Sequence, residues 1–356
     1  IFSSLFIHEI SLKNITKSFT FGFYFLFALS FSYYLKKIDL EKIKTASFFF
    51  LAIIIFIYFD LIFQFLNPEF KDIFGFKVSA IRSYFILGHE ITLPLRLSGP
   101  FKDELVPGFY LSTLGFVFII LFFNLTNYKN QKIYLNFFLI LNLIFIILSG
   151  ERSSMIIGIL FLTLYFLSQK ISLKKKILNI LLLLIFLIAS IKLIPTTNER
   201  FQDLKNWSRL DSNIFKSFLK TEWGTHYQVA YRMTMNKPFF GSGIRTFRNE
   251  CKNFEINSGE FDLNGKGCAT HPHNYVLEIS SETGIIFLIL FLIFIYRFLF
   301  EYYKKNKTYI NVNFIFIFLS FLFPFRPTGS IFSSWYGSFF WILILFILFS
   351  EKLNPK

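Results

Sequence analysis

The segment CATHPHNYVLEISSETGIIFLILFL (residues 268–292) places two histidines, an asparagine and two glutamates directly before an apolar run. A neutral imidazole accepts a proton from an attacking hydroxyl group, which is the work of a general base. Pro272 suits the first turn of a helix, where its missing N–H has no partner to lose. We therefore expect a helix to begin here, with His273 in its first turn as the catalytic base. The alternative is a histidine that only caps a helix at the lipid interface.

The expected helix has a polar face. Spacings of three and four residues put Asn274, Glu278 and either Ser281 or Glu282 on one side, next to His273. The free N–H groups and the positive dipole end of such a helix suit an anion such as a phosphate. We therefore predict that Asn274 and Glu278 bind substrate.

An arginine stands in a second polar stretch, GERSS (150–154), between two apolar segments. An arginine at a membrane boundary is often only an interfacial anchor. Here Glu151, Ser153 and Ser154 accompany Arg152, which favours a pocket. A guanidinium group forms forked contacts with phosphates, so we predict that Arg152 binds an anionic leaving group.

The rest of the chain is strongly apolar. Hydrophobic residues make up 54% of its 356 residues, and the mean hydropathy is +0.53. Long apolar runs are typical of membrane spans. The net charge of +15 would favour nucleic-acid binding in a soluble protein, but in a membrane protein the position of the charges matters more. We therefore expect a lipid bilayer and no nucleic acid as a partner.

We predict an all-α polytopic membrane protein with about nine transmembrane helices and a long periplasmic loop that contains short helices. The chain begins at IFSSLF with neither an initiator Met nor a visible signal peptide, so we expect it to be truncated, with residues 1–8 as the tail of an earlier helix. The expected spans are 19–35, 46–66, 108–127, 133–149, 154–168, 177–194, 283–300, 310–324 and 339–350.

Lysine-rich and lysine-poor connections alternate between these spans. The positive-inside rule assigns the lysine-rich ones to the cytoplasm. These are 36–44, 128–132, 169–176 and 301–307. The others then face outward, and they are 67–107, 150–154, 195–282 and 325–338.

The long outward loop 195–282 has its own pattern. Apolar residues at helical spacing from Phe201 to Phe218 predict an amphipathic helix over 198–220, lying along the outer membrane face. The stretch KPFFGSG (237–243) predicts a turn, because proline and glycine punctuate it.

The chain has two cysteines, Cys251 and Cys268, and both lie in this loop. A cysteine pair outside the cytoplasm is usually oxidised, so we expect a disulfide. Two unrelated thiols are one alternative. A metal site formed by Cys268, His271 and His273 is another, although it lacks a clear fourth ligand.

Four stretches resemble the O-antigen ligase and O-antigen polymerase superfamily. HPHNYVLEISSETGIIFLILFL closely resembles its signature, in which a His-Asn pair opens a helix followed by a Leu, a Glu and a Gly. LSGERSSMIIGILFL resembles its outward-turn arginine motif. RLSGPFKDELVPGFYLS (96–112) is similar to its first outward loop, and AYRMTMNKPFFGSGIRTFRNEC (230–251) to the stretch before the histidine. They occur in the family's order and cover most of residues 60–295.

The resemblance implies a multi-pass inner-membrane glycosyltransferase that works at the periplasmic face without a metal or other cofactor. His273 matches the family's essential histidine, and Arg152 matches its turn arginine. The family also uses an arginine in the long outward loop, about four helical turns before the PFFGSG-like turn. That register holds Trp223 to His226 here, so Arg232, Arg245 or His226 stands in.

The implied donor is a glycan on undecaprenyl diphosphate, and the implied acceptor is a saccharide or lipid A core. Ligase and polymerase both remain open, because they share these motifs. The resemblance divides the chain into N-terminal helices with the first periplasmic loop (1–132), a ligase-like core (133–300) and C-terminal helices (301–356).

Two other classes of protein compete with this interpretation. A transporter or flippase of a lipid-linked glycan would place polar groups at mid-membrane depth, whereas they gather here at one face. A metal-dependent glycosyltransferase would need an acidic motif in its first outward loop. Asp60, Glu69 and Asp72 are available there, but without a recognisable ligand spacing.

Overall fold

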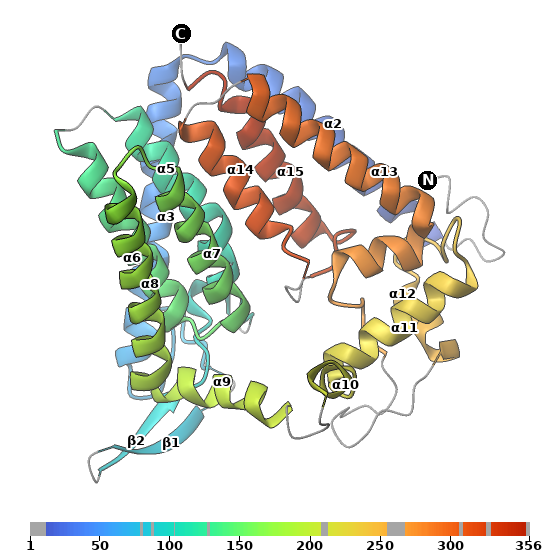
Figure 1. Ribbon diagram of the computed structural model, residues 1–356, viewed down its shortest axis with the longest axis horizontal. Helices are drawn as coiled ribbons and strands as arrows, with labels where there is room; N and C mark the ends of the chain where they lie inside the picture. Colours follow the sequence, from blue (N-terminus) through green and yellow to red (C-terminus); the bar gives the residue numbers. More distant parts are fainter. Residues whose placement is uncertain are drawn as a thin grey trace. The chain divides into compact units, whose positions relative to one another are not determined.

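The computed structural model describes residues 12–78, 81–86, 89–102, 104–126, 129–207, 213–254, 268–305, 309–324 and 329–353. These residues are mainly helical (Figure 1). The chain divides into two compact units. One comprises residues 1–36, 204–307 and 322–349 and is called the histidine unit below; the other comprises 37–203, 308–321 and 350–356 and is called the arginine unit.

The arginine unit is built around helix α5, most of which is buried. Helix α5 (Phe116–Leu125) packs against α3 (Leu40–Leu66), α6 (Gln131–Leu148) and α14 (Tyr309–Phe321), and every residue from Phe116 to Phe123 is buried. A helix that is apolar on all sides is stable only when neighbours surround it, as here. Helix α4 (Pro107–Tyr110) continues through a π-helical turn (Leu111–Gly115) into α5. The other helices are α7 (Arg152–Ser168), α8 (Leu173–Leu193) and α9 (Pro195–Trp207).

The histidine unit contains two pairs of packed helices. Helix α2 (Leu12–Lys37) contacts α15 (Ser334–Phe349) through aromatic rings, with the centroids of Phe21 and Trp341 5.6 Å apart. The second pair is α11 (Glu222–Asn236) and α13 (Tyr275–Lys305). The short helices of this unit are α10 (Ile214–Leu219) and α12 (Phe247–Glu250), and a 3-10 turn follows at Cys251–Phe254.

A β-hairpin interrupts the helical architecture of the first expected outward loop. Strand β1 (Ile81–Ile86) pairs antiparallel with β2 (His89–Pro94). Tyr84 donates a hydrogen bond to Glu199 of α9 and so ties the hairpin to that helix. The expectation of an all-α protein is therefore wrong in this loop. The physical reason is that IRSYFI is rich in β-branched and aromatic residues, which favour extended backbone.

Each of the nine apolar segments expected to span the membrane overlaps a helix. Within the described part of the chain, five helical stretches are long and apolar enough to cross a bilayer: Leu40–Leu66, Pro107–Leu125, Gln131–Leu148, Leu173–Leu193 and Tyr275–Lys305. Three shorter apolar helices occur at Arg152–Ser168, Ile310–Phe321 and Trp335–Phe349. The helical, many-span class is thus confirmed, and the count of nine spans stays a prediction.

The single amphipathic helix expected over 198–220 is wrong. Helix α9 ends at Trp207, and a second helix, α10, begins after Asn213. The side chain of Asn213 accepts hydrogen bonds from the amides of Phe215 (2.9 Å) and Lys216 (3.4 Å). An asparagine cap therefore starts a new helix where apolar spacing alone predicts continuity. Leu210 of that pattern, and the expected helix tail at residues 1–8, lie outside the described residues.

Candidate active site

Helix α13 begins at Tyr275, three residues after the expected start at Pro272. Asn274 is its cap, since Asn274 Oδ1 accepts hydrogen bonds from the amides of Val276 (3.0 Å) and Leu277 (3.2 Å). The NH₂ group of Asn274 donates to the carbonyl of Pro324 (2.7 Å). Substrate binding by Asn274 stays a prediction. The cap also satisfies amides that were expected to face an anion.

His273 lies just outside the helix and not in its first turn. Its φ angle is 54°, in the left-handed region that residues with a side chain seldom adopt. The backbone needs this conformation to pass from the preceding loop into the Asn274 cap. Such conformations persist where the surrounding structure holds them, and they concentrate at functional sites.

Three aromatic rings surround His273. Its centroid lies 4.7 Å from Trp223 in an edge-on contact, 5.6 Å from His226 in a stacked contact, and 4.1 Å from His271. Trp223 and His226 come from the first turns of α11. The structure thus joins the expected His273 and His226, and it adds Trp223 and His271, which motif spacing did not assign to the site. We call these four residues the histidine cluster.

His226 is held within the histidine cluster by its own helix, α11. It is 3% exposed, and its Nε2 lies 3.9 Å from a carboxylate oxygen of Glu222, one turn earlier on α11. His271 is held by Thr270, whose hydroxyl lies 2.8 Å from Nδ1. Because so little of His226 is exposed, its geometry suits positioning the neighbouring His273 better than wide contact with a substrate.

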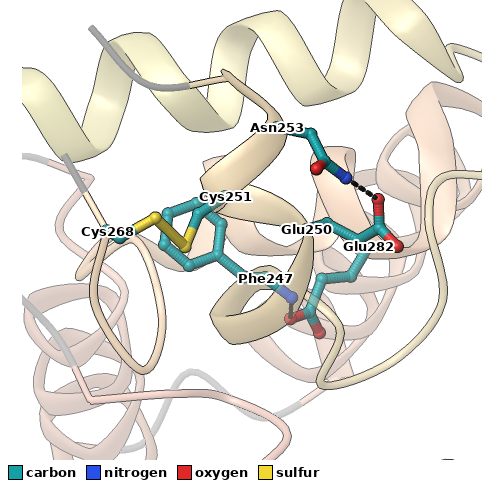
Figure 2. Close-up of a disulfide and its surroundings, with 6 residues drawn as sticks. All are labelled: Phe247, Glu250, Cys251, Asn253, Cys268 and Glu282. Carbon is teal, nitrogen blue, oxygen red and sulfur yellow. Dashed lines mark hydrogen bonds between the residues drawn. A yellow bond between two sulfur atoms is a disulfide. The ribbon is translucent and has the colours of Figure 1, made fainter. Parts of the chain in front are cut away.

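A disulfide braces the loop that leads to His273. Cys251 is bonded to Cys268, with their Cα atoms 5.4 Å apart (Figure 2). Cys251 is fully buried in an apolar cluster with Val229, Met233 and Phe247, and Cys268 packs against it. This cluster unites α11, α12 and the segment before the histidines. The disulfide also takes up the Cys268 sulfur, so the alternative of a Cys268, His271 and His273 metal site is wrong.

The predicted turn over 237–243 packs against a kink in α13. At Gly284 the helix has φ +88°, and a side chain there would lie 2.1 Å from the carbonyl oxygen of Phe239. Three backbone hydrogen bonds join the two segments, from Ser242 N to Ser281 O, from Gly243 N to Glu282 O, and from Ile285 N to Pro238 O. The kink separates the polar start of α13 from its apolar remainder, so it marks where the site ends.

The two glutamates of α13 bind backbone amides. Glu282 accepts from the amides of Arg245 (2.6 Å) and Phe247 (3.1 Å; Figure 2). Glu278 accepts from the amide of Ile331 (2.8 Å). Both carboxylates are about 1% exposed. Glu278 was predicted to bind substrate, but the structure gives it a partner in the loop before α15 and leaves it almost no exposed surface.

The loop arginines separate from one another. Arg232 is exposed on α11. Arg245 is partly buried and has φ 64°. Burial lowers the pKa of Arg245, and the nearby Arg248 lowers it further, whereas Glu282 opposes the shift. Arg248, which no motif singled out, has a buried Nε without a hydrogen-bond partner.

Arg152 is the first residue of α7, in the arginine unit. It lines a small cavity together with Gly150 and Met155, and Thr197 and Phe201 of α9 lie on the other side. Gly150 has φ +74°, and a side chain there would lie 2.5 Å from the carbonyl oxygen of Leu95. The tight turn expected at 150–154 is therefore present, and only glycine fits its first position.

Glu151 anchors this turn, which motif reasoning did not foresee. One carboxylate oxygen accepts from the amide of Gly108 (2.9 Å), and the other accepts from the hydroxyl of Ser154 (2.8 Å). The guanidinium of Arg96 lies 3.8 Å from the first of these oxygens. Burial lowers the pKa of Arg96, and the Glu151 carboxylate counteracts this. The turn that carries Arg152 is thus fixed by segments distant in sequence.

The apolar helices are those of a multi-pass membrane protein, and each unit carries its polar cluster at helix ends. Residues 135–292 match the family model described as O-antigen ligase. This region includes most of α6, the helices α7 to α12, the histidine cluster and the start of α13, and the match supports the resemblance to the O-antigen ligase and O-antigen polymerase superfamily. The match supports glycan transfer of the O-antigen ligase type. No curated protein matches the chain.

No group of three or more His, Cys, Asp or Glu side chains is placed to hold a metal ion within the described ranges. The side chains of the histidine cluster offer their own chemistry. Its imidazoles accept and donate protons, and Trp223 adds a flat apolar ring beside His273.

Proposed function

We propose that the protein is an inner-membrane glycosyltransferase that moves a glycan from undecaprenyl diphosphate to a saccharide or lipid-linked acceptor at the periplasmic face. The observation that carries the proposal is the position of His273. His273 has a left-handed backbone conformation and lies within the histidine cluster, directly before the capped helix α13. The loop that leads to it is braced by the disulfide and lies inside the region that matches O-antigen ligases.

In the proposed reaction His273 is the general base. Its imidazole takes the proton of an acceptor hydroxyl while the hydroxyl oxygen bonds to the anomeric carbon of the donor sugar. The bond from that carbon to the diphosphate oxygen breaks, and undecaprenyl diphosphate leaves as an anion. The family resemblance gives Arg152 the role of binding this diphosphate, for which a guanidinium fork is suited.

The remaining candidates take secondary roles in this proposal. His226 positions the imidazole of His273, and Arg245 is the loop arginine best supported, since its partial burial would strengthen contact with an anion. Arg232 is exposed and is the weaker of the two loop arginines. The division of the chain into 1–132, 133–300 and 301–356 follows the same proposal.

A transporter or flippase of a lipid-linked glycan is the competing function. In α13 the stretch 285–295, directly after the kink at Gly284, is wholly apolar, whereas Glu278 and Glu282 lie before the kink. A transport pathway would need polar groups along the span. This distribution favours an enzyme that works at one membrane surface.

The purified protein in detergent, given an undecaprenyl-diphosphate-linked glycan and an acceptor saccharide, tests the proposal. Released undecaprenyl diphosphate and elongated acceptor are both measured. Wild type should form the two products in equal amounts, and His273→Ala should form neither while keeping its unfolding temperature. His89→Ala, on the exposed strand β2, is the matched control. Full activity in His273→Ala would contradict the role of this residue.

The orientation needs a separate test. Reporters fused after Lys175 and Lys305 should behave as cytoplasmic, and a reporter at Asn257 as periplasmic, because lysine-rich connections stay inside. A cytoplasmic signal at Asn257 would invert the topology and rule out transfer at the periplasmic face.

A further inference from the structure

Asp60 of α3 and Asp72 of the following loop lie near each other at the end of α3. Asp60 is 0% exposed and Asp72 is 2% exposed. Asp60 Oδ1 accepts a hydrogen bond from the amide of Ile73 (2.8 Å), which directly follows Asp72 in the chain. A buried pair of like charges is costly unless something positive lies between them.

Each of these carboxylates uses only one of its oxygens. Asp72 Oδ1 accepts from the amides of Phe74 (2.9 Å) and Phe76 (2.8 Å), in the same way as Asp60 Oδ1 serves Ile73. The Oδ2 atoms of both aspartates are buried and have no hydrogen-bond partner. Two orphaned carboxylate oxygens in one small region are rare, because buried polar atoms are almost always satisfied.

No basic side chain of the described loop pairs with either aspartate. Lys71 forms its ion pair with Glu69, and Lys102 lies over the ring of Phe76, 5.3 Å from its centroid. Lys71 and Lys102 thus each have another partner. A bound cation would balance the charge of the buried pair.

The pattern of used and unused oxygens is that of a site for a hard cation. In such sites a carboxylate gives one oxygen to the metal, and hydrogen bonds orient the ligating group. Here the loop amides donate hydrogen bonds to Oδ1 of both aspartates, and Oδ2 of both aspartates has no hydrogen-bond partner. Gly99 lies beside this region, and a side-chain carbon there would be 4.0 Å from Asp60 Oδ2.

We propose that Asp60 and Asp72 bind a divalent cation, Mg²⁺ or Ca²⁺, through their Oδ2 atoms and so fasten the loop 67–78 to the end of α3. Backbone carbonyls or water complete the coordination, as is usual for these ions. The cation stabilises the first outward loop and takes no part in the transfer step. The site is independent of the proposed glycosyltransferase function.

Thermal unfolding of the full chain in detergent tests the site. EDTA should lower the unfolding temperature of the wild type by about 5 °C, and millimolar Mg²⁺ or Ca²⁺ should restore it. Comparing the two ions at equal concentrations identifies the preferred one. Asp60→Asn and Asp72→Asn keep the oxygen that accepts from the loop amides, so each should fold, lose the cation response and unfold at a higher temperature than wild type in EDTA.

Glu69→Gln is the matched control, because Glu69 lies in the same loop but is exposed and paired with Lys71. It should keep the full response to cations. An unfolding temperature of the wild type that ignores EDTA and both ions, but rises as the pH falls, would overturn the proposal in favour of a proton shared by the two aspartates. If the Asn variants do not fold, calorimetric titration of EDTA-treated wild type with Ca²⁺ and Mg²⁺ decides: one saturable site supports the proposal, and no binding of either refutes it.

Discussion

The imidazole of His273 stacks on that of His226, with centroids 5.6 Å apart and ring planes 28° from parallel. The two rings come from segments that are distant in the chain, one in the first turns of α11 and the other just before α13. A flat neighbour at stacking distance restricts the rotation of His273 about its side-chain bonds. A general base needs this restriction, because proton transfer depends on orientation.

Replacing His226 should therefore impair transfer through the placement of His273. We expect His226→Ala to lower kcat on the order of 100-fold, as for a misplacement of about 1 Å. His226→Phe keeps a flat ring at the same place and should recover most of this loss. Both are measured as product release under saturating donor and acceptor. An inactive His226→Phe variant with a normal unfolding temperature would mean that a ring nitrogen of His226 is itself required.

The disulfide should matter for both stability and activity. Cys251 and Cys268 are 17 residues apart in sequence, and closing a loop of this size stabilises a fold by about 3 kcal/mol. Cys251→Ser should lower the unfolding temperature and the transfer rate, because the apolar cluster with Phe247 loses its link to the histidine segment. Reduction of the wild type should reproduce this loss.

Thiol labelling is the direct check on the same bond. In the native, unreduced protein neither cysteine should react, whereas both should react after reduction and unfolding. Modification of both cysteines without reductant would show that the bond does not form in the membrane.

Local signals in the sequence were strong where a single property decides the structure. Long runs without charge predicted the helices, since a helix satisfies its own backbone in an apolar setting. They failed where two local rules compete. At HPHN, Pro272 suits a first helical turn and Asn274 suits a cap, and the structure follows the asparagine. That choice moved His273 out of the helix.

Contacts between distant segments were beyond prediction from one sequence. The bonds from the amides of Arg245 and Phe247 to Glu282, and the anchoring of the Arg152 turn by Glu151 and Arg96, depend on how helices pack. No periodicity reports them. The motifs named His273 and Arg152 because those residues follow recognisable patterns, whereas Glu282 looked like one more member of a polar face.

Gly284 should tolerate no side chain. Its φ is +88°, and a side-chain carbon added there would lie 2.1 Å from the carbonyl oxygen of Phe239, which leaves no room for a methyl group. We expect Gly284→Ala to destabilise the protein by about 3 kcal/mol or more, because backbone and not a flexible side chain must move. Gly22→Ala on α2 meets nothing within 4 Å and should stay within about 1 kcal/mol of the wild type. Thermal unfolding of the two variants in parallel gives the comparison, and equal stabilities would contradict the kink.

Arg152 should not be replaceable by lysine. Arg152→Lys keeps the positive charge but cannot form a forked pair of hydrogen bonds with a diphosphate, so we expect kcat/KM for the lipid-linked donor to fall on the order of 100-fold. Arg82→Lys in strand β1 is the matched control, because Arg82 is exposed and its ion pair is with Glu199. Its activity should remain close to that of the wild type.

The variant Glu151→Gln separates anchoring of the turn from binding of the diphosphate. Its amide oxygen can still accept from the amide of Gly108, but the negative charge beside Arg96 is lost. We expect a loss smaller than that of Arg152→Lys, together with a lower unfolding temperature, whereas Arg152→Lys should unfold at the wild-type temperature. Full donor turnover in Arg152→Lys at normal stability would show that charge alone suffices and that the forked contact does not form.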